Sequence, residues 1–202
     1  MKKLVIAVVG LLCFAPAALA DNWGVGFRVG AAENDPKDMQ DAYDSIVANK
    51  ELDKGYGVFS LEALYEWNLS DEANKIGAKL GLDVYGSNEL KTTGYKAEET
   101  TYALPLTVYF KRDNGVQNWS WFAGAGLTFL RTEVEESGLF NDTTSKSKVF
   151  PHITAGAEYR FSRLFALGLD VKYNIAAKVK KNGYVMSDRS GIGAALTGRF
   201  YF

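Results

Sequence analysis

The sequence is poor in the residues on which several common classes of site depend. It has one cysteine, one histidine and four prolines among its 202 residues. The cysteine, Cys13, lies in the apolar N-terminal stretch, so a chain cleaved after Ala20 keeps no cysteine and forms no disulfide framework. No later run approaches about eighteen consecutive apolar residues, which excludes a transmembrane helix there. The near balance of 23 basic and 24 acidic residues gives no reason to expect a nucleic-acid partner.

The N-terminus has the pattern of an export signal. Two lysines precede an apolar core from Leu4 to Phe14, and Ala18–Ala20 forms a small-residue cleavage pattern. We therefore expect a cleaved signal peptide over residues 1–20 and a single domain over residues 21–202, exported through the periplasm.

The sequence is rich in aromatic residues and glycine, with 12 Phe, 11 Tyr, 4 Trp and 20 Gly. Its last twelve residues, 191–202, alternate between apolar side chains such as Leu196 and a mixed polar set that includes Arg199. Successive side chains of a strand point to opposite faces, so this alternation predicts a strand with one apolar face. Seven upstream segments show the same pattern. The predicted strands are residues 22–32, 56–68, 76–85, 102–110, 119–129, 149–161, 165–175 and 191–202.

The connections between these segments alternate between long and short. Long polar segments are predicted as loops after residue 32, up to Lys96, over 132–148 and over 178–188. This arrangement predicts an all-β fold, an eight-stranded antiparallel up-and-down transmembrane β-barrel, with long external loops and both termini at the periplasmic end. In the first loop, an N-cap and helical spacing of apolar residues predict a short helix within residues 36–52. Pro105 lies inside the fourth predicted strand and removes one ladder hydrogen bond.

The charged residues of the predicted strands fall almost entirely on the face opposite the apolar residues. A soluble barrel would bury its apolar face, so the pattern favours a lipid-facing apolar exterior over the soluble alternative. We expect the charges to pair within the barrel, because charge that faces hydrocarbon is costly. The predicted lumen charge network consists of Arg28, Glu62, Glu66, Lys79, Asp83, Lys111, Glu158, Arg160, Asp170, Lys172 and Arg199.

All four tryptophans lie at strand ends on the predicted periplasmic side. Aromatic side chains gather at membrane interfaces, so these residues predict an aromatic girdle. The girdle tryptophans are Trp23, Trp67, Trp119 and Trp121.

The export signal, the eight amphipathic strands and the ending Gly198–Phe202 resemble the small outer-membrane β-barrel (porin-like) family of Gram-negative bacteria. This is the group around the membrane domain of outer-membrane protein A, and Pro151–Tyr159 is similar to its sixth strand. The resemblance implies a location in the bacterial outer membrane, in contact with its lipid and lipopolysaccharide. It also implies that Phe200, Tyr201 and Phe202 form the signal read by the barrel-assembly machinery.

Few residues suggest catalysis. His152 with Thr154 and Glu158 invites comparison with outer-membrane enzymes that deacylate lipid A, but threonine would replace serine, and His152 is predicted to face the lumen. A lumen histidine hydrogen-bonded to its neighbours is therefore favoured. The Glu62/Glu66 pair fits salt bridges of a plug better than acid–base catalysis.

Two further patterns concern glycine and lysine. The runs Gly24–Gly26 and Gly124–Gly126 are not followed by a helix, so they are not phosphate cradles and instead leave room for bulky lumen neighbours. Lysines 178, 180 and 181 either touch lipopolysaccharide phosphates or form a solvated loop; the sequence leaves both interpretations open.

We therefore expect a monomeric, non-enzymatic outer-membrane protein with a structural or surface-interaction role. Its external loops would make the specific contacts, and side chains would fill its lumen. We expect no catalytic residues, cofactor, metal or nucleic acid. A narrow pore for small solutes or ions is the alternative, and a lipid A-modifying enzyme is a weaker one, because it needs an outward-facing catalytic cluster that the sequence does not show.

Overall fold

The computed structural model describes residues 22–33, 55–71, 73–92, 95–115, 118–138, 142–181 and 184–202. The predicted signal peptide over residues 1–20 and the predicted helix within 36–52 lie outside these residues. Within the described residues, no helix has the length and apolar character needed to cross a membrane.

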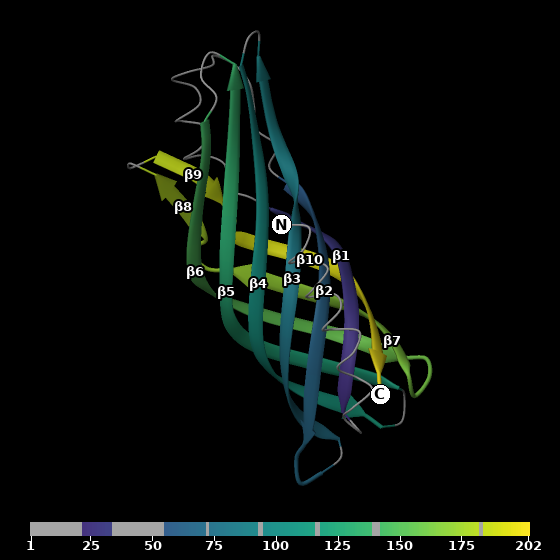
Figure 1. Ribbon diagram of the computed structural model, residues 1–202. Coiled ribbons are helices and arrows are strands. Elements are labelled where there is room, and N and C mark those ends of the chain that lie inside the picture. Colours follow the sequence, from purple (N-terminus) through teal and green to yellow (C-terminus); the bar gives the residue numbers. More distant parts are fainter. Residues whose placement is uncertain are drawn as a thin grey trace.

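Eight antiparallel strands close into a barrel, which confirms the predicted fold class (Figure 1). The barrel strands are β1 (Trp23–Glu33), β2 (Gly55–Asn68), β3 (Asn74–Thr92), β4 (Tyr95–Asn114), β5 (Trp119–Gly138), β6 (Asp142–Arg160), β7 (Phe165–Asn174) and β10 (Gly191–Tyr201). Each strand pairs with its sequence neighbour in the barrel, and β1 pairs with β10 to close it, from Gly24 opposite Tyr201 to Ala32 opposite Gly193. Closure leaves no free edge between the first and last strands.

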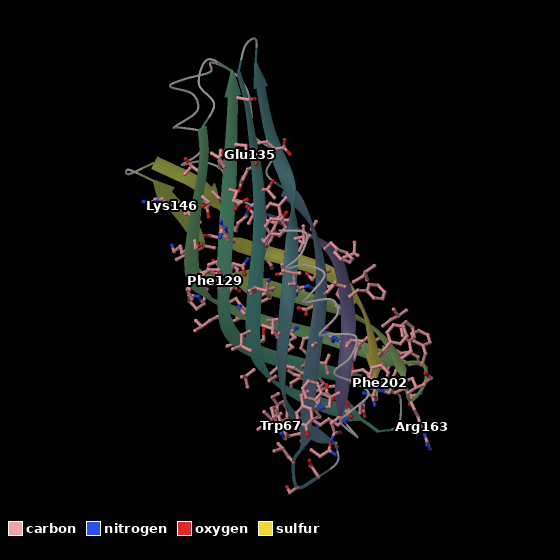
Figure 2. The ribbon with its side chains drawn as sticks, in the orientation of Figure 1. Trp67, Phe129, Glu135, Lys146, Arg163 and Phe202 are labelled. Atoms are coloured by element: carbon pink, nitrogen blue, oxygen red, sulfur yellow. The ribbon has the colours of Figure 1, made fainter. Side chains whose placement is uncertain are left out.

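Both ends of the barrel chain lie at one end of the molecule, which we call the terminal end. The Asn22 amide donates to the Phe202 carbonyl at 3.1 Å, and the Phe202 amide donates to the Trp23 carbonyl at 2.8 Å. Figure 2 shows Trp67, Arg163 and Phe202 at this end and Glu135 and Lys146 toward the opposite one, which we call the loop end.

The predicted alternation of side chains is present along the barrel strands. In β2, Ser60, Glu62 and Glu66 are buried, whereas Phe59 and Trp67 are exposed. The same holds around the barrel, so its outer surface is apolar and its interior is polar. A water-soluble barrel has the opposite distribution, with an apolar interior and a polar exterior. The distribution seen here is that of a barrel whose outer surface faces the hydrocarbon core of a membrane.

Pro105 has the effect on the sheet that the sequence predicts. The β3–β4 ladder is interrupted between the pairs Leu80–Leu106 and Asp83–Ala103, whereas Pro105 remains opposite Thr128 of β5. The glycine at position 81 gives the ring room, because a Cβ there would stand 3.0 Å from the Pro105 Cγ. The strand therefore tolerates proline at the cost of a local break on one side.

Three of the predicted long loops are wrong, because the structure forms strands in them. β3 and β4 continue as a hairpin until Thr92 faces Tyr95, and β5 and β6 continue through the segment 132–148, where Thr132 faces Lys146. These four strands rise beyond the rest of the barrel (Figure 1). The sequence of the extensions has polar residues at both parities, so it lacks the apolar alternation that marks a half-buried strand. Their β structure comes from ladder pairing that continues upward from the barrel wall.

The predicted lysine-rich loop at 178–188 also contains strands. It forms a two-stranded hairpin of β8 (Lys178–Lys181) and β9 (Tyr184–Asp188). The hairpin stands between β7 and β10 in the chain and belongs to a separate small sheet at the loop end (Figure 1). This position makes it an insertion into the barrel rather than a part of its wall.

Candidate functional site

The lumen contains a network of ion pairs in three layers. The first layer lies at the terminal end and surrounds Lys111 of β4. Its Nζ donates to Glu66 Oε1 at 3.0 Å, to the Tyr201 hydroxyl at 3.1 Å and to Glu158. The Tyr201 hydroxyl in turn donates to Glu158 at 2.9 Å. Four strands, β2, β4, β6 and β10, therefore meet through one buried ammonium group.

Arg199 connects this layer to the next. Its Nε donates to Glu62 Oε1 at 2.5 Å and its Nη1 to Glu158 Oε2 at 2.9 Å. Its third nitrogen lies 3.6 Å from Asp170 Oδ2, to which Lys79 Nζ also donates at 2.8 Å. Arg199 thus contacts three carboxylates from three different strands.

The third layer lies farther toward the loop end. Arg28 donates to Asp83 Oδ1 at 3.0 Å and contacts Asp170 at 3.6 Å, while Lys172 donates to Asp83 Oδ2 at 2.6 Å. The Ser60 hydroxyl accepts a further bond from Arg28 at 3.2 Å. Asp170 is shared between the second and third layers, so the three layers form one continuous network.

The ten predicted charges inside the lumen balance, and Lys75, which the sequence did not predict as a member, adds a further cation 3.7 Å from Glu66 Oε2. Five cations, Arg28, Lys79, Lys111, Lys172 and Arg199, meet five anions, Glu62, Glu66, Asp83, Glu158 and Asp170. The eleventh predicted member, Arg160, lies at the rim with its side chain 31% exposed and 4.0 Å from Glu158. The structure therefore brings the predicted charged residues together, ten inside and one at the edge.

Little space remains between these side chains. Cavities of about 10 and 30 Å³ lie beside the Arg28 layer, both lined by Arg28 and Lys172. A single water molecule needs roughly 10–15 Å³ of such space. The lumen around the network has room for isolated waters.

His152 lies in the wall next to the network, as predicted for a lumen histidine. Its Nε2 lies 2.9 Å from the Thr107 hydroxyl and its Nδ1 lies 2.8 Å from the Thr128 hydroxyl. Thr154 instead donates to Asp170 at 2.6 Å, and Glu158 contacts Lys111 and Arg199. His152, Thr154 and Glu158 therefore do not combine into a histidine-activated nucleophile.

Two lumen glycines make room for bulky neighbours, in line with the sequence prediction for the Gly124–Gly126 run. A Cβ on Gly126 would stand 2.8 Å from the His152 Cε1 and would clash with the Leu106 carbonyl oxygen. A Cβ on Gly77 would overlap the ring of Tyr109. Side chains at these positions would displace the histidine and the tyrosine ring.

The aromatic residues of the terminal end form chains of ring contacts. Trp23 and Trp67 each contact the ring of Tyr65, at 4.9 and 4.6 Å between centroids. Trp119 contacts Tyr159 at 5.1 Å. Trp121 contacts the ring of Phe110 at 5.6 Å on the neighbouring strand. These rings lie on the outer surface of one end, where an interfacial girdle is expected.

The three C-terminal aromatic residues divide between the two faces of β10. Phe200 and Phe202 are exposed on the outer surface, whereas Tyr201 is buried and belongs to the Lys111 layer. The first two extend the outer aromatic surface, and Phe200 lies 5.0 Å from the Phe165 ring. That the barrel-assembly machinery recognises Phe200, Tyr201 and Phe202 stays a prediction.

A second buried cluster lies at the loop end, and the alternation of the sequence does not predict it. Arg189 is fully buried there beside Tyr56, Tyr85 and Glu99. Arg189 follows the segment predicted as a loop, so strand alternation does not reach it. The inward parity of Tyr56 and Tyr85 was the one signal in the sequence that pointed to this cluster.

The closed barrel, the apolar outer surface and the ion-filled lumen define a small transmembrane β-barrel. A family model of the outer membrane protein beta-barrel domain matches residues 4–200. The chain belongs to this family and resides in the bacterial outer membrane.

Solved structures show the same fold at low sequence identity. Neisserial surface protein A is 13% identical with a TM-score of 0.56, over 89% of this chain and 96% of that chain. Ail, the attachment invasion locus protein of Yersinia pestis, is 13% identical with a TM-score of 0.52, over 91% and 99%. A major outer membrane protein from Thermus thermophilus is 12% identical with a TM-score of 0.53, over 89% and 99%. A comparison with curated protein sequences finds no match. At such low sequence identity the similarity shows only that the fold is shared. The function has to be inferred from the residues of this chain.

Proposed function

We propose that the protein is a monomeric, non-enzymatic outer-membrane barrel with a closed lumen, whose loop end makes its specific contacts. The observation that carries this proposal is the continuous ion-pair network across the lumen. A conducting pore needs an uninterrupted aqueous path, and Lys111, Arg199 and Arg28 each reach across the barrel to carboxylates on other strands.

The chemistry of the network supports a plug rather than a water-lined path. Its charges are desolvated, and breaking one buried pair leaves an uncompensated charge at a cost of about 3–5 kcal/mol. Phe122 adds to the obstruction, because its ring lies 5.1 Å from Lys79 Nζ and 4.9 Å from the Arg199 guanidinium carbon. Opening a path would require several of these contacts to break together.

Planar-bilayer recording tests the closed lumen. Purified, refolded wild-type protein should give negligible steady conductance, and Leu169→Ala, which alters only the lipid-facing surface, is the matched control. Steady, ion-selective channels in the wild type that a bulky substitution at Gly81 or Gly193 abolishes would overturn the proposal and favour a pore.

Lipopolysaccharide is the expected lipid contact of the loop end. Lys180 of β8 is exposed at this end, beyond the exposed apolar residues Val149 and Ile175 of the outer surface. Lys146 is also exposed, on the face of β6 that farther down carries the buried Phe150. Ammonium groups just above an apolar belt are suited to bind the phosphates of the outer-leaflet lipid through screened charge. The same arrangement serves an interaction role without any catalytic group.

Reconstitution into vesicles with and without lipopolysaccharide tests this contact. Thermal unfolding of the wild type should shift upward in lipopolysaccharide vesicles. The shift should shrink in Lys146→Gln/Lys180→Gln but not in the control Arg163→Gln at the terminal end. An equal shift for both variants would contradict a role for these lysines.

A further inference from the structure

Arg189 at the loop end is held like a bound ligand. It is fully buried, and its guanidinium carbon lies 4.1 Å from the centroid of the Tyr56 ring and 5.4 Å from that of Tyr85. Its Nη2 donates to Glu99 Oε1 at 2.8 Å. Two aromatic rings and a carboxylate therefore surround one organic cation.

The hydrogen bonds of this guanidinium group are incomplete. Nε and Nη1 of Arg189 have no hydrogen-bond partner among the described residues, and the buried hydroxyl of Tyr56 has none either. Arg199 in the lumen also has one nitrogen, Nη2, without a hydrogen bond, but its guanidinium group lies within 4 Å of three carboxylates. Buried donors without partners cost free energy, so Arg189 is a poorer fit to its surroundings than a structural lumen charge.

The residues around Arg189 and Arg189 itself come from different parts of the fold. Tyr56, Tyr85 and Glu99 belong to β2, β3 and β4 of the barrel wall, whereas Arg189 follows β9 of the inserted hairpin. The insertion joins the wall at backbone bends with positive φ, 53° at Ala176 and 129° at Gly191. The two tyrosines and Glu99 therefore belong to the barrel wall, whereas Arg189 belongs to the inserted segment.

The Tyr56 and Tyr85 rings are themselves arranged to receive a flat cation. They pack edge to face with centroids 5.3 Å apart, within a cluster of buried apolar side chains that includes Leu130, Phe150 and, from the inserted segment, Val179. A guanidinium group stacks on aromatic faces and forms directed hydrogen bonds to a carboxylate. Thr101 Oγ1 donates to the same Glu99 oxygen at 3.0 Å, which helps to hold the carboxylate in place.

We propose that Tyr56, Tyr85 and Glu99 form a binding site for a small guanidinium compound, and that Arg189 occupies this site as an internal competitor. A ligand then has to displace Arg189, so its apparent affinity falls by the fraction of molecules in which the site is open. The inference rests on the proposed interaction role of the loop end. Its readout is cation binding, so its failure is distinguishable from a failure of the closed lumen, which conductance reports.

The experiment removes the internal competitor from the full-length, folded protein. Arg189→Ala should bind ethylguanidine saturably in isothermal titration calorimetry, at least tenfold more tightly than the wild type, with NaCl of equal ionic strength as the salt control. Arg163→Ala is the matched control, because it deletes an exposed arginine at the terminal end and should bind no better than the wild type. Adding Glu99→Gln or Tyr56→Leu to Arg189→Ala should weaken binding at least tenfold.

Three outcomes would overturn the proposal. The first is equal binding by Arg189→Ala and Arg163→Ala, and the second is binding that survives Glu99→Gln undiminished. The third applies if Arg189→Ala refolds poorly. In that case ethylguanidine, but not NaCl, should restore the folded form that shifts in gel mobility on heating, and failure of ethylguanidine to restore this form would overturn the proposal.

Discussion

Arg199 shows how much a single lumen residue holds in place. It binds Glu62 and Glu158 directly and lies near Asp170, so its removal leaves buried carboxylates without their main counter-charge. Buried ion pairs of this kind add little net stability compared with an apolar replacement, yet losing one partner is costly. The stability of the plug therefore depends on keeping its members together.

We predict that Arg199→Ala lowers the free energy of unfolding by about 3–5 kcal/mol, since the stranded carboxylates gain no compensating hydration. Urea unfolding in lipid vesicles measures the effect. Glu62→Ala, which strands the same pair from the other side, should act in the same direction. The control Arg163→Ala lies in an exposed turn and should change stability by no more than about 0.5 kcal/mol. Similar effects of Arg199→Ala and Arg163→Ala would contradict a paired lumen.

On the lipid-facing surface, the introduction of a charge is expected to be destabilising, whereas in the lumen it is the removal of one. Leu169 of β7 is 50% exposed on the lipid-facing surface. We predict that Leu169→Arg costs about 2–4 kcal/mol in the same vesicle assay, because a charge near the middle of the bilayer is poorly solvated. Leu169→Met should be nearly neutral. A neutral effect of the arginine would place this position outside the hydrocarbon region.

At the scale of the elements, β10 combines closure of the barrel with its last lumen contacts. It pairs with β1 along nine residues and with β7 along ten, and Phe202 adds a hydrogen bond to the Trp23 carbonyl. An unpaired β10 would leave two open edges, which are sites of aggregation and proteolysis. Assembly of the barrel thus requires this strand to dock on both sides.

We predict that deletion of Phe202 slows insertion and leaves a protease-sensitive periplasmic population. The deletion removes the hydrogen bond to the Trp23 carbonyl and the exposed aromatic side chain that directly follows β10. Cell fractionation followed by protease treatment measures the two populations. Phe161→Ala, which removes an exposed aromatic residue from a turn at the same end, is the control. Unchanged outer-membrane levels after the deletion would contradict the assembly role.

On the scale of the whole molecule, the barrel has two different ends. The terminal end carries contacting aromatic rings on its outside and the Lys111 layer within. The loop end carries the extensions of β3 to β6 and the β8–β9 hairpin (Figure 1). Aromatic rings on the outside of the terminal end are typical of a membrane interface. The strand extensions and the hairpin of the loop end are suited to contact other molecules. A non-enzymatic interaction role is therefore the proposal that uses both ends.

Much of this architecture is local and could be read along the chain. Alternation with period two identifies each barrel strand and its lipid-facing side, because side-chain direction in a strand depends only on parity. The same rule placed Arg28 and Glu62 inside and Phe59 outside, as observed. The lengths of β3 to β6 escaped it, because a segment with polar residues at both parities has no apolar side to identify it as a strand.

What the tertiary structure alone decided is which residues meet. Arg199 and Glu62 are 137 residues apart, and Lys79 and Asp170 are 91 apart, so their pairing depends on strand register and closure of the barrel. The position of Arg189 depends in addition on the inserted segment, which joins the barrel wall at two backbone bends and places the Arg189 guanidinium over the rings of Tyr56 and Tyr85. The sequence by itself determined the strands, their lipid-facing side and the charged character of the lumen. Partners across the lumen and at the loop end followed only from the fold, since contacts between distant residues have no local pattern.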